Sequence, residues 1–278
     1  MKTLIADAGS TKTEWAALVD GKMIRTLTTE GMNPFQSTLS EESLTKQIAN
    51  LLKDGAPDEV FFYGAGCKGE GLKTMSKLLN NTIRDAKIVI NTDMLGAARS
   101  VLGHEAGIAC ILGTGSNSCL YDGQAIQENV SPLGYVLGDE GSGAVLGKLL
   151  VREVFKGDLN YLKQALYNDY GVDEQTLLER VYRKPYPNRF LASLAPFIYD
   201  HREEPLVRKL IIDEFVSYFK HNVERYAKPE LPVSCVGSIA WWFKEELKEA
   251  ANLRNITLNK IVQKPLEGLV EYHVNFNE

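Results

Sequence analysis

The sequence predicts an α/β fold of two duplicated domains, each a mixed β-sheet flanked by helices. Two observations lead to this prediction. In the first part of the chain, short apolar strands alternate with amphipathic helices, an order typical of sheets covered by helices. The strand pattern of residues 4–24 then starts again at Ala109. Such a restart indicates that one domain has been copied to form the second.

The composition is that of a globular protein. The 278 residues are 44% hydrophobic and 24% charged, which argues against disorder. A formal net charge of −5 argues against a broad nucleic-acid-binding surface. No apolar run is long enough to span a bilayer, and the early charges predict no signal peptide. The four cysteines form no CxxC pair, so we expect reduced, packed cysteines and a cytoplasmic protein.

The first domain is predicted to begin with a β-meander. Its second turn is Asp20-Gly21, a pair that favours the positive φ angles of a tight hairpin. Further along, the pattern predicts a helix capped by Ser40, a strand at 60–63, a helix at 72–79 and a strand at 88–90.

The second domain repeats the meander and is then mostly helical. The repeat consists of a strand at 109–112, a small-residue turn at 113–117 and strands at 120–126. Helices are predicted at 142–155, 159–167 and 205–226, then a strand at 231–236 and a helix from Trp241.

Both meanders contain a turn suited to phosphate. Asp7 to Thr13 and Gly113 to Asn117 combine glycine with small hydroxylated residues, so backbone N–H groups can approach a phosphate closely. Asp7, at the end of a strand, is suited to hold Mg²⁺ directly or through water. An ordinary hairpin is the alternative for either turn alone. Two such turns at the same place in two copies favour a shared polyphosphate ligand.

Asp93 follows the strand at 88–90 and precedes a helix of small residues. A carboxylate at the carboxyl end of a strand faces the crevice where ligands bind in α/β sheets. There it can accept a proton from a substrate hydroxyl. Residue type alone favours a helix cap at this position.

The segment from Gly134 to Gly143 is predicted to be a shaped polar loop, because its glycines are interleaved with Asp139 and Glu140. Carboxylates accept two hydrogen bonds in fixed directions, so they match sugar hydroxyls well. The helix that follows is expected to start near Ser142.

With these motifs in order, the chain resembles the N-acetylglucosamine kinase branch of the BadF/BadG/BcrA/BcrD ATPase family. The resemblance runs from Asp-Ala-Gly-Ser-Thr-Lys-Thr at Asp7 to Val-Gly-Ser at Val236. It implies two ribonuclease H-like (actin-like ATPase) domains with the active site in the cleft between them. The implied domains are residues 1–106 and 107–266, and the C-terminal segment 267–278 is able to complete the first.

The resemblance also implies roles for single residues. Asp93 corresponds to the catalytic base. ATP and its phosphates would be bound by Asp7, Gly9, Ser10, Thr11, Lys12, Thr13, Gly113, Thr114 and Gly115, with Gly237 and Ser238 as the adenosine motif. The sugar would be bound by Asn33, Ser116, Asn117, Gly134, Tyr135, Asp139 and Glu140.

The function implied is ATP- and Mg²⁺-dependent phosphorylation of an amino sugar, most closely N-acetylglucosamine, at its 6-hydroxyl by a homodimer. Two segments depart from the family pattern. Gly134-Tyr135-Val136-Leu137 stands where mammalian relatives have Gly-Trp-Gly-His, and Glu203-Glu204-Pro205-Leu206 stands where they have Gly-Asp-Pro-Leu.

Three other functions are compatible with this fold. One is an ATPase that activates a dehydratase or reductase through a cysteine-bound iron–sulfur cluster. The others are a non-catalytic sugar sensor and an ATP-dependent scaffold related to actin. The cysteine spacing does not match the first, and the retained Asp93 favours a catalyst over a sensor.

Overall fold

The computed structural model describes residues 1–35, 40–51 and 55–274 of the chain. Contacts divide the chain into two compact units. Unit 1 comprises Met1–Glu105 together with Asp122–Ala125 and the chain from Lys264 onward, and unit 2 comprises Ala106–Tyr121 and Ile126–Gln263. The last four residues of the predicted completing segment, 275–278, lie outside the described residues.

Unit 1 is built on a five-stranded mixed sheet in the order β3-β2-β1-β4-β5. The strands are β1 Lys2–Ala8, β2 Lys12–Val19, β3 Lys22–Glu30, β4 Glu59–Gly64 and β5 Lys87–Thr92. The first three form an antiparallel meander, and β4 and β5 run parallel to β1. Asp20 and Gly21 both have positive φ, which confirms the predicted tight hairpin.

The central position of β1 explains its apolar sequence. Leu4, Ile5, Ala6 and Ala8 are all fully buried, as expected for a strand covered on both faces. Leu4, Ala6 and Ala8 pack in one core cluster, and Ile5 packs in another. This alternation follows from the two-residue period of a strand.

The helices of unit 1 are α1 Glu41–Leu51, α2 Gly69–Thr82, α3 Asp93–Leu102 and α13 Leu266–Val274. Side chains of α1 and α2 share the cluster of Leu4 and Ala6, whereas Leu266 and Leu269 of α13 share the cluster of Ile5. The sheet is therefore covered on both faces, and α13 packs against α3.

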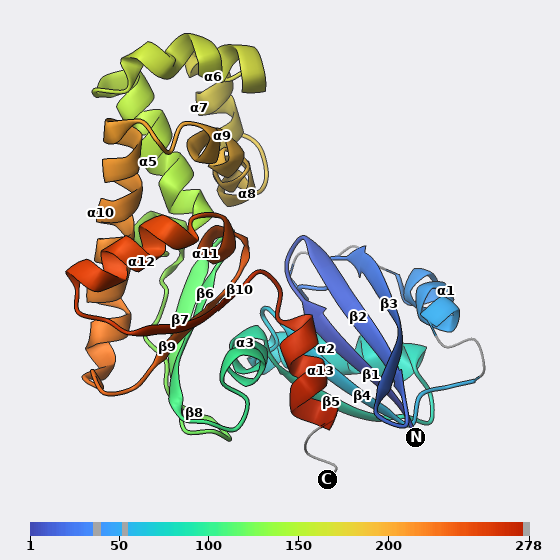
Figure 1. Cartoon of the computed structure of the whole chain (residues 1–278). Coiled ribbons are helices and arrows are strands. Elements are labelled where there is room, and N and C mark those ends of the chain that lie inside the picture. The colour runs from blue at the N-terminus through green and yellow to red at the C-terminus, as the bar shows by residue number, and fades with distance from the viewer. Residues whose placement is uncertain (36–39, 52–54, 275–278) are drawn as a thin grey trace. The chain divides into compact units, whose positions relative to one another are not determined.

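Unit 2 repeats this topology. Its sheet has the order β10-β9-β6-β7-β8, with β6 Gly107–Leu112, β7 Ser116–Tyr121, β8 Ile126–Glu128, β9 Val233–Val236 and β10 Leu258–Val262. The antiparallel meander β6-β7-β8 corresponds to β1-β2-β3, and the parallel strands β9 and β10 correspond to β4 and β5. Figure 1 shows the two sheets, and their common order confirms the predicted duplication.

The rest of unit 2 is helical. The α-helices are α4 Gly134–Leu137, α5 Gly143–Lys156, α6 Lys163–Tyr170, α7 Glu174–Tyr182, α8 Pro187–Ala192, α9 Ala195–Asp200, α10 Pro205–His221, α11 Ser238–Trp242 and α12 Lys244–Leu253; the 3₁₀ helices are η1 Asn160–Leu162 and η2 Val223–Tyr226. Side chains of α5 and α10 share one core cluster with residues of β6 and β9. Among the described residues, no helix is long and apolar enough to cross a membrane.

Several predicted helix limits were wrong. The helix expected through Tyr226 ends at His221, where the side-chain amide of Asn222 donates to the carbonyl of Tyr218, 3.2 Å away. The helix expected at 159–167 is a 3₁₀ turn followed by α6, which ends at Gly171 in the left-handed region. Near Trp241 there are two helices, and the first already starts at Ser238.

Candidate functional site

In unit 1, the predicted phosphate turn is a tight reversal between β1 and β2. The amide of Gly9 donates to the carbonyl of Lys12 at 3.0 Å. The side-chain amide of Asn33 donates to the hydroxyl of Ser10 at 3.0 Å, and the Asn33 oxygen accepts from the amide of Phe35 at 3.0 Å. A residue predicted to bind phosphate and a residue predicted to bind the sugar are therefore hydrogen-bonded to each other.

Asp7 and Asp93 lie at the same edge of this sheet. In the strand register Asp7 pairs with Tyr63, and Tyr63 pairs with Asn91, so β1 and β5 reach this edge together. Asp93 begins α3 directly after β5. The two carboxylates are close enough that the charge of Asp93 affects the titration of Asp7.

Both carboxyls titrate at raised pKa. Burial, and then the charges of Asp93 and Glu14, raise the pKa of Asp7 to about 7, although Lys12 opposes this. Burial also raises the pKa of Asp93, against the amide of Met94, which donates to it at 2.9 Å, and the positive charge of Lys68. Raised pKa values at a strand end are characteristic of functional carboxylates.

Asp93 is not the cap of its helix, so the interpretation that residue type alone favoured was wrong. The N-cap is Thr92, whose hydroxyl accepts from the amide of Leu95 at 3.3 Å. Asp93 is the first helical residue. Since Thr92 supplies the capping hydroxyl, the carboxylate of Asp93 needs another explanation than helix capping.

Two predicted phosphate ligands have different surroundings from those expected. The ammonium of Lys12 lies 3.2 Å from a carboxylate oxygen of Glu14, which Lys264 also contacts at 2.6 Å. Thr13 is fully buried within β2, and its hydroxyl has no hydrogen-bond partner. The Thr13 side chain is therefore enclosed in the core, whereas Lys12 is exposed at the turn.

Sequence reasoning missed two neighbours of Asp93. Lys68, at the N-cap of α2, acts electrostatically on Asp93. The side-chain amide nitrogen of Asn91 is buried and has no hydrogen-bond partner. Asn91 and Thr92 directly precede Asp93, so the Asn-Thr-Asp triplet is the sequence feature that could have pointed to Asn91. Nothing in the local sequence signalled Lys68, because it comes from another element.

In unit 2, the predicted second phosphate turn is closed by the amide of Gly113, which donates to the carbonyl of Gly115 at 2.9 Å. The turn is also bonded to the start of α5. The amides of Gly143 and Ala144 donate to the carbonyls of Gly113 and Thr114, at 2.8 and 3.1 Å. The first-turn amides of α5 thereby fix the turn.

Asp139 lies against this turn. A Cβ on Gly115 would come 3.2 Å from a carboxylate oxygen of Asp139, and the backbone amide of Ser116 is near enough to lower the pKa of the Asp139 carboxyl. Burial raises the pKa of Asp139 to about 6, against this effect of Ser116, and the charge of Glu140 contributes. The hydroxyl of Ser116 is buried without a partner. Two predicted sugar-binding segments therefore meet here.

The segment before Asp139 is more ordered than predicted. Gly134–Leu137 forms the short helix α4, where a polar loop was expected. The carbonyl of Tyr135 accepts from the ammonium of Lys148 on α5 at 2.7 Å. Leu133, just before α4, has a φ of 59° and Asp139 a φ of 53°, so a strained residue lies on each side of the helix. The expected helix start near Ser142 is confirmed: Ser142 is the N-cap of α5, and its hydroxyl accepts from the amide of Val145 at 3.2 Å.

The predicted adenosine motif lies beside the second turn. Gly237 has a φ of +127°, and a Cβ on it would meet the carbonyl oxygen of Leu112 at 2.2 Å. Only glycine allows β9 to end so close to β6. Ser238 is exposed at the start of α11. The motif therefore abuts the residue that precedes Gly113.

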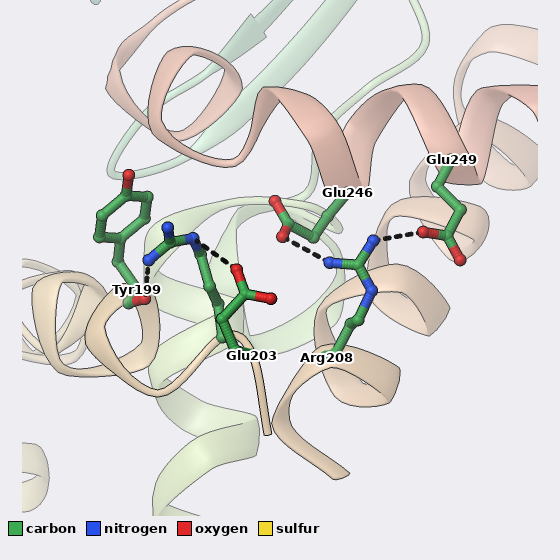
Figure 2. A network of polar contacts seen from close by, with 6 residues as sticks. Tyr199, Glu203, Arg208, Glu246 and Glu249 are labelled. Atoms are coloured by element: carbon green, nitrogen blue, oxygen red, sulfur yellow. Dashed lines mark hydrogen bonds and ion pairs between the residues drawn. The ribbon is translucent and has the colours of Figure 1, made fainter. Parts of the chain in front are cut away.

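The segment that departs from the family pattern has partners within unit 2. A carboxylate oxygen of Glu204 accepts from the hydroxyl of Tyr161 at 2.5 Å, and the other lies 2.5 Å from Nδ1 of His201. Glu203 lies 3.6 Å from the guanidinium of Arg202. Figure 2 shows Glu203 near Tyr199 and a separate network in which Arg208 lies between Glu246 and Glu249.

Comparison with known proteins gives a family match and full-length structural matches. The model of the BadF/BadG/BcrA/BcrD ATPase family matches residues 6–240. A Porphyromonas gingivalis protein, provisionally assigned as an N-acetylglucosamine kinase, is 43% identical with a TM-score of 0.94, covering 99% of this chain and 100% of that one. A Chromobacterium violaceum protein with the same provisional assignment is 19% identical with a TM-score of 0.78, covering 98% of each chain.

The fold extends to a more distant group of proteins. A ROK hexokinase from Thermus thermophilus has a TM-score of 0.60 at 14% identity, and the match covers 98% of each chain. At this identity the likeness concerns the fold. It supports the predicted pair of actin-like ATPase domains.

Proposed function

Because this chain belongs to the BadF/BadG/BcrA/BcrD ATPase family, we propose that it is an ATP-dependent sugar kinase that phosphorylates the 6-hydroxyl of N-acetylglucosamine. The proposal rests mainly on the environment of Asp93. This residue is a partly buried carboxylate at the end of β5, its pKa is raised, and helix capping is done by Thr92 instead. The relative at 43% identity supports the choice of sugar.

Asp93 acts as the general base. It orients the attacking hydroxyl and accepts its proton as the oxygen attacks the γ-phosphorus of ATP. Burial raises its pKa, so the carboxylate takes up a proton more readily. The positive charge of Lys68 partly compensates the negative charge of the carboxylate. A positioned carboxylate of this kind contributes roughly 10²–10⁴-fold to the rate.

Asp7 is the residue best suited to Mg²⁺. The negative charges of Asp93 and Glu14 repel its carboxylate. Protonation of Asp7 reduces this repulsion, and a bound divalent cation would reduce it as well. When bound with the nucleotide, Mg²⁺ neutralises charge on the phosphates. Asp7 would hold it directly or through water, and the Gly9–Thr11 turn would contact the phosphates through its amides.

The turns of both units contribute to nucleotide binding in this proposal, Ser10 and Thr11 from unit 1 and Gly113 to Gly115 from unit 2. Gly237 and Ser238 contact the adenosine. The sugar is bound by Asn33, whose side chain is fixed by Ser10, and by Asp139, which lies beside the turn at Gly115.

The location and assembly are also part of the proposal. Four buried cysteines that form no disulfide suit a reducing, cytoplasmic environment, and the family resemblance implies a homodimer. Size-exclusion chromatography with light scattering would distinguish dimer from monomer. Burial of all four cysteines also disfavours the iron–sulfur activator, which needs cysteines that reach a shared cluster.

A coupled ADP-release assay across amino sugars and hexoses tests the proposal. We expect N-acetylglucosamine to stimulate ADP release above glucosamine, N-acetylmuramic acid and glucose. Phosphorus NMR of the product should show a 6-phosphate monoester. If no sugar stimulates ADP release, the kinase proposal is wrong; if only another sugar does, the substrate is wrong and the chemistry stands.

A further inference from the structure

One face of α10 contacts both predicted sugar-binding segments of unit 2. Glu214, Tyr218 and Asn222 are spaced four residues apart, a spacing that places side chains above one another on a helix. Each forms a polar contact with residue 117, 140 or 141.

Glu214 binds the backbone directly beside the predicted sugar-binding carboxylates. Its side chain is only 9% exposed, and its Oε1 accepts from the amide of Gly141 at 2.8 Å. Gly141 stands between Glu140 and the N-cap Ser142. A carboxylate bound to a backbone amide makes a strong, charge-assisted hydrogen bond, so Glu214 fixes the end of this segment.

Tyr218 binds the other segment. It is fully buried, and its hydroxyl donates to the carbonyl of Asn117 at 3.0 Å. The same side chain also packs beneath the first segment, because a Cβ on Gly141 would come 3.0 Å from the Cβ of Tyr218. One side chain thus contacts both segments.

The end of α10 adds contacts to Glu140. The side-chain amide of Asn222 lies 3.5 Å from one carboxylate oxygen of Glu140, and Nδ1 of His221 lies 3.6 Å from the other. Glu140 therefore contacts the end of α10, whereas Asp139 lies against the turn at Gly115. The two adjacent carboxylates thus lie against different parts of unit 2.

We propose that Glu214 and Tyr218 are positioning residues that fix the spacing between segment 116–117 and segment 139–141, and so determine the affinity for the sugar. This inference rests on the proposed function. Neither residue touches the sugar; each acts through a backbone group of a segment that does. An apolar helix face would fill the core equally well. Burying a carboxylate and a hydroxyl costs free energy unless both are hydrogen-bonded, so these two groups are better explained by the hydrogen bonds that they form.

Steady-state kinetics of three variants test the proposal. Tyr218→Phe removes one hydroxyl and should raise KM for N-acetylglucosamine about 5- to 10-fold, the value of one neutral hydrogen bond. Glu214→Ala should raise it about 10- to 100-fold, because the buried amide of Gly141 loses its acceptor. Glu214→Gln keeps an acceptor oxygen and should recover most of the affinity. KM for ATP should change less than about twofold in all three variants, which is a smaller change than the loss of a single hydrogen bond causes.

Glu246→Gln is the matched control. Glu246 is also a buried carboxylate of unit 2, 2% exposed, but it binds the guanidinium of Arg208 at 2.9 Å. Figure 2 shows this contact between Arg208 and Glu246. This variant should lower the melting temperature without changing KM for the sugar. Equal changes in both KM values for Tyr218→Phe, or a change in melting temperature alone, would overturn the proposal.

Hydrogen exchange gives a readout that needs no turnover. In the ligand-free protein, the amides of residues 138–142 should exchange faster in Glu214→Ala than in the parent, and at the parent rate in Glu246→Gln. Unchanged exchange in Glu214→Ala contradicts the positioning role. A parent protein without sugar-dependent ADP release overturns the proposed function instead, and the exchange result still decides whether Glu214 orders the segment.

Discussion

The negative charge of Asp93 helps to raise the pKa of Asp7 to about 7. Asp7 lies near the end of β1 and Asp93 directly follows β5, and β4 separates these two strands in the sheet. Protonation of Asp7 relieves their repulsion when no cation is present. In the proposed function a divalent cation relieves the same repulsion; without a cation, the ionised form of Asp7 reduces the stability of the folded protein.

The first prediction concerns the stability of the Asp7→Asn variant. The pKa of Asp7 is about 7 in the folded protein against an ordinary value of 3.8, so the folded state binds the proton more tightly than the unfolded state. The stability from this group is complete below the lower pKa and is lost as pH rises to the upper one. Asparagine cannot ionise, so the variant should melt above the parent, with a larger difference at pH 8 than at pH 5.

Thermal unfolding at both pH values checks this prediction. Addition of Mg²⁺ and ADP at pH 8 should stabilise the parent more than the variant, because the variant lacks the carboxylate that would hold the ion. A melting-temperature difference that is the same at pH 5 and pH 8 would show that Asp7 does not titrate between them.

The second prediction concerns the pH dependence of sugar binding. A carboxylate accepts hydrogen bonds from sugar hydroxyls at both oxygens only when it is ionised, and the pKa of Asp139 is about 6. KM for the sugar should therefore rise as pH falls through about 6, and stay level from pH 7 to 8. The Asp139→Asn variant should have a higher KM without this dependence. A parent KM for the sugar that stays level from pH 5 to 8 would contradict the assignment of Asp139 to the sugar site.

The third prediction compares two glycines in the left-handed region. Gly141 and Gly171 have φ of +72° and +62°, but a Cβ on Gly141 meets Tyr218 and Leu112 at 3.0 and 3.1 Å, whereas one on Gly171 meets nothing within 4 Å. Gly171→Ala should cost about 1 kcal/mol of unfolding free energy from backbone strain alone. Gly141→Ala should cost about 1–3 kcal/mol more, because it also overpacks the core.

Urea unfolding of both variants measures the difference. Sugar KM should rise in Gly141→Ala only, since its segment carries Asp139 and Glu140. Equal destabilisation of the two variants would show that the region around Tyr218 relaxes without cost.

The sequence was informative where local rules determine the structure. The Asp20-Gly21 hairpin follows from turn chemistry, and the apolar run of β1 follows from burial on both faces. The duplication could be predicted because small residues recur at 9–11 and 113–116. These features depend on short stretches of neighbouring residues, so they can be predicted from the amino-acid sequence.

The missed features depend on contacts between distant residues. Thr92 and Asp93 are both good caps by residue type, and the backbone geometry at the start of α3 decides for Thr92. The contact of Lys264 with Glu14, the ion-pair partner of Lys12, could not be predicted either, because Lys264 is distant in the sequence. Glu214 occurs in an ordinary amphipathic stretch, and only the fold brings it to Gly141.

The measurement that tests the central claim most directly is the turnover of Asp93→Asn beside Thr92→Ala. Thr92→Ala removes the helix cap and should lower the unfolding free energy by about 1 kcal/mol, with turnover close to the parent. Asp93→Asn should lower turnover by roughly 10²–10⁴-fold, the contribution of a positioned general base, and should still bind ADP in a calorimetric titration. Sugar phosphorylation by Asp93→Asn at the parent rate would contradict the assignment of Asp93 as the base.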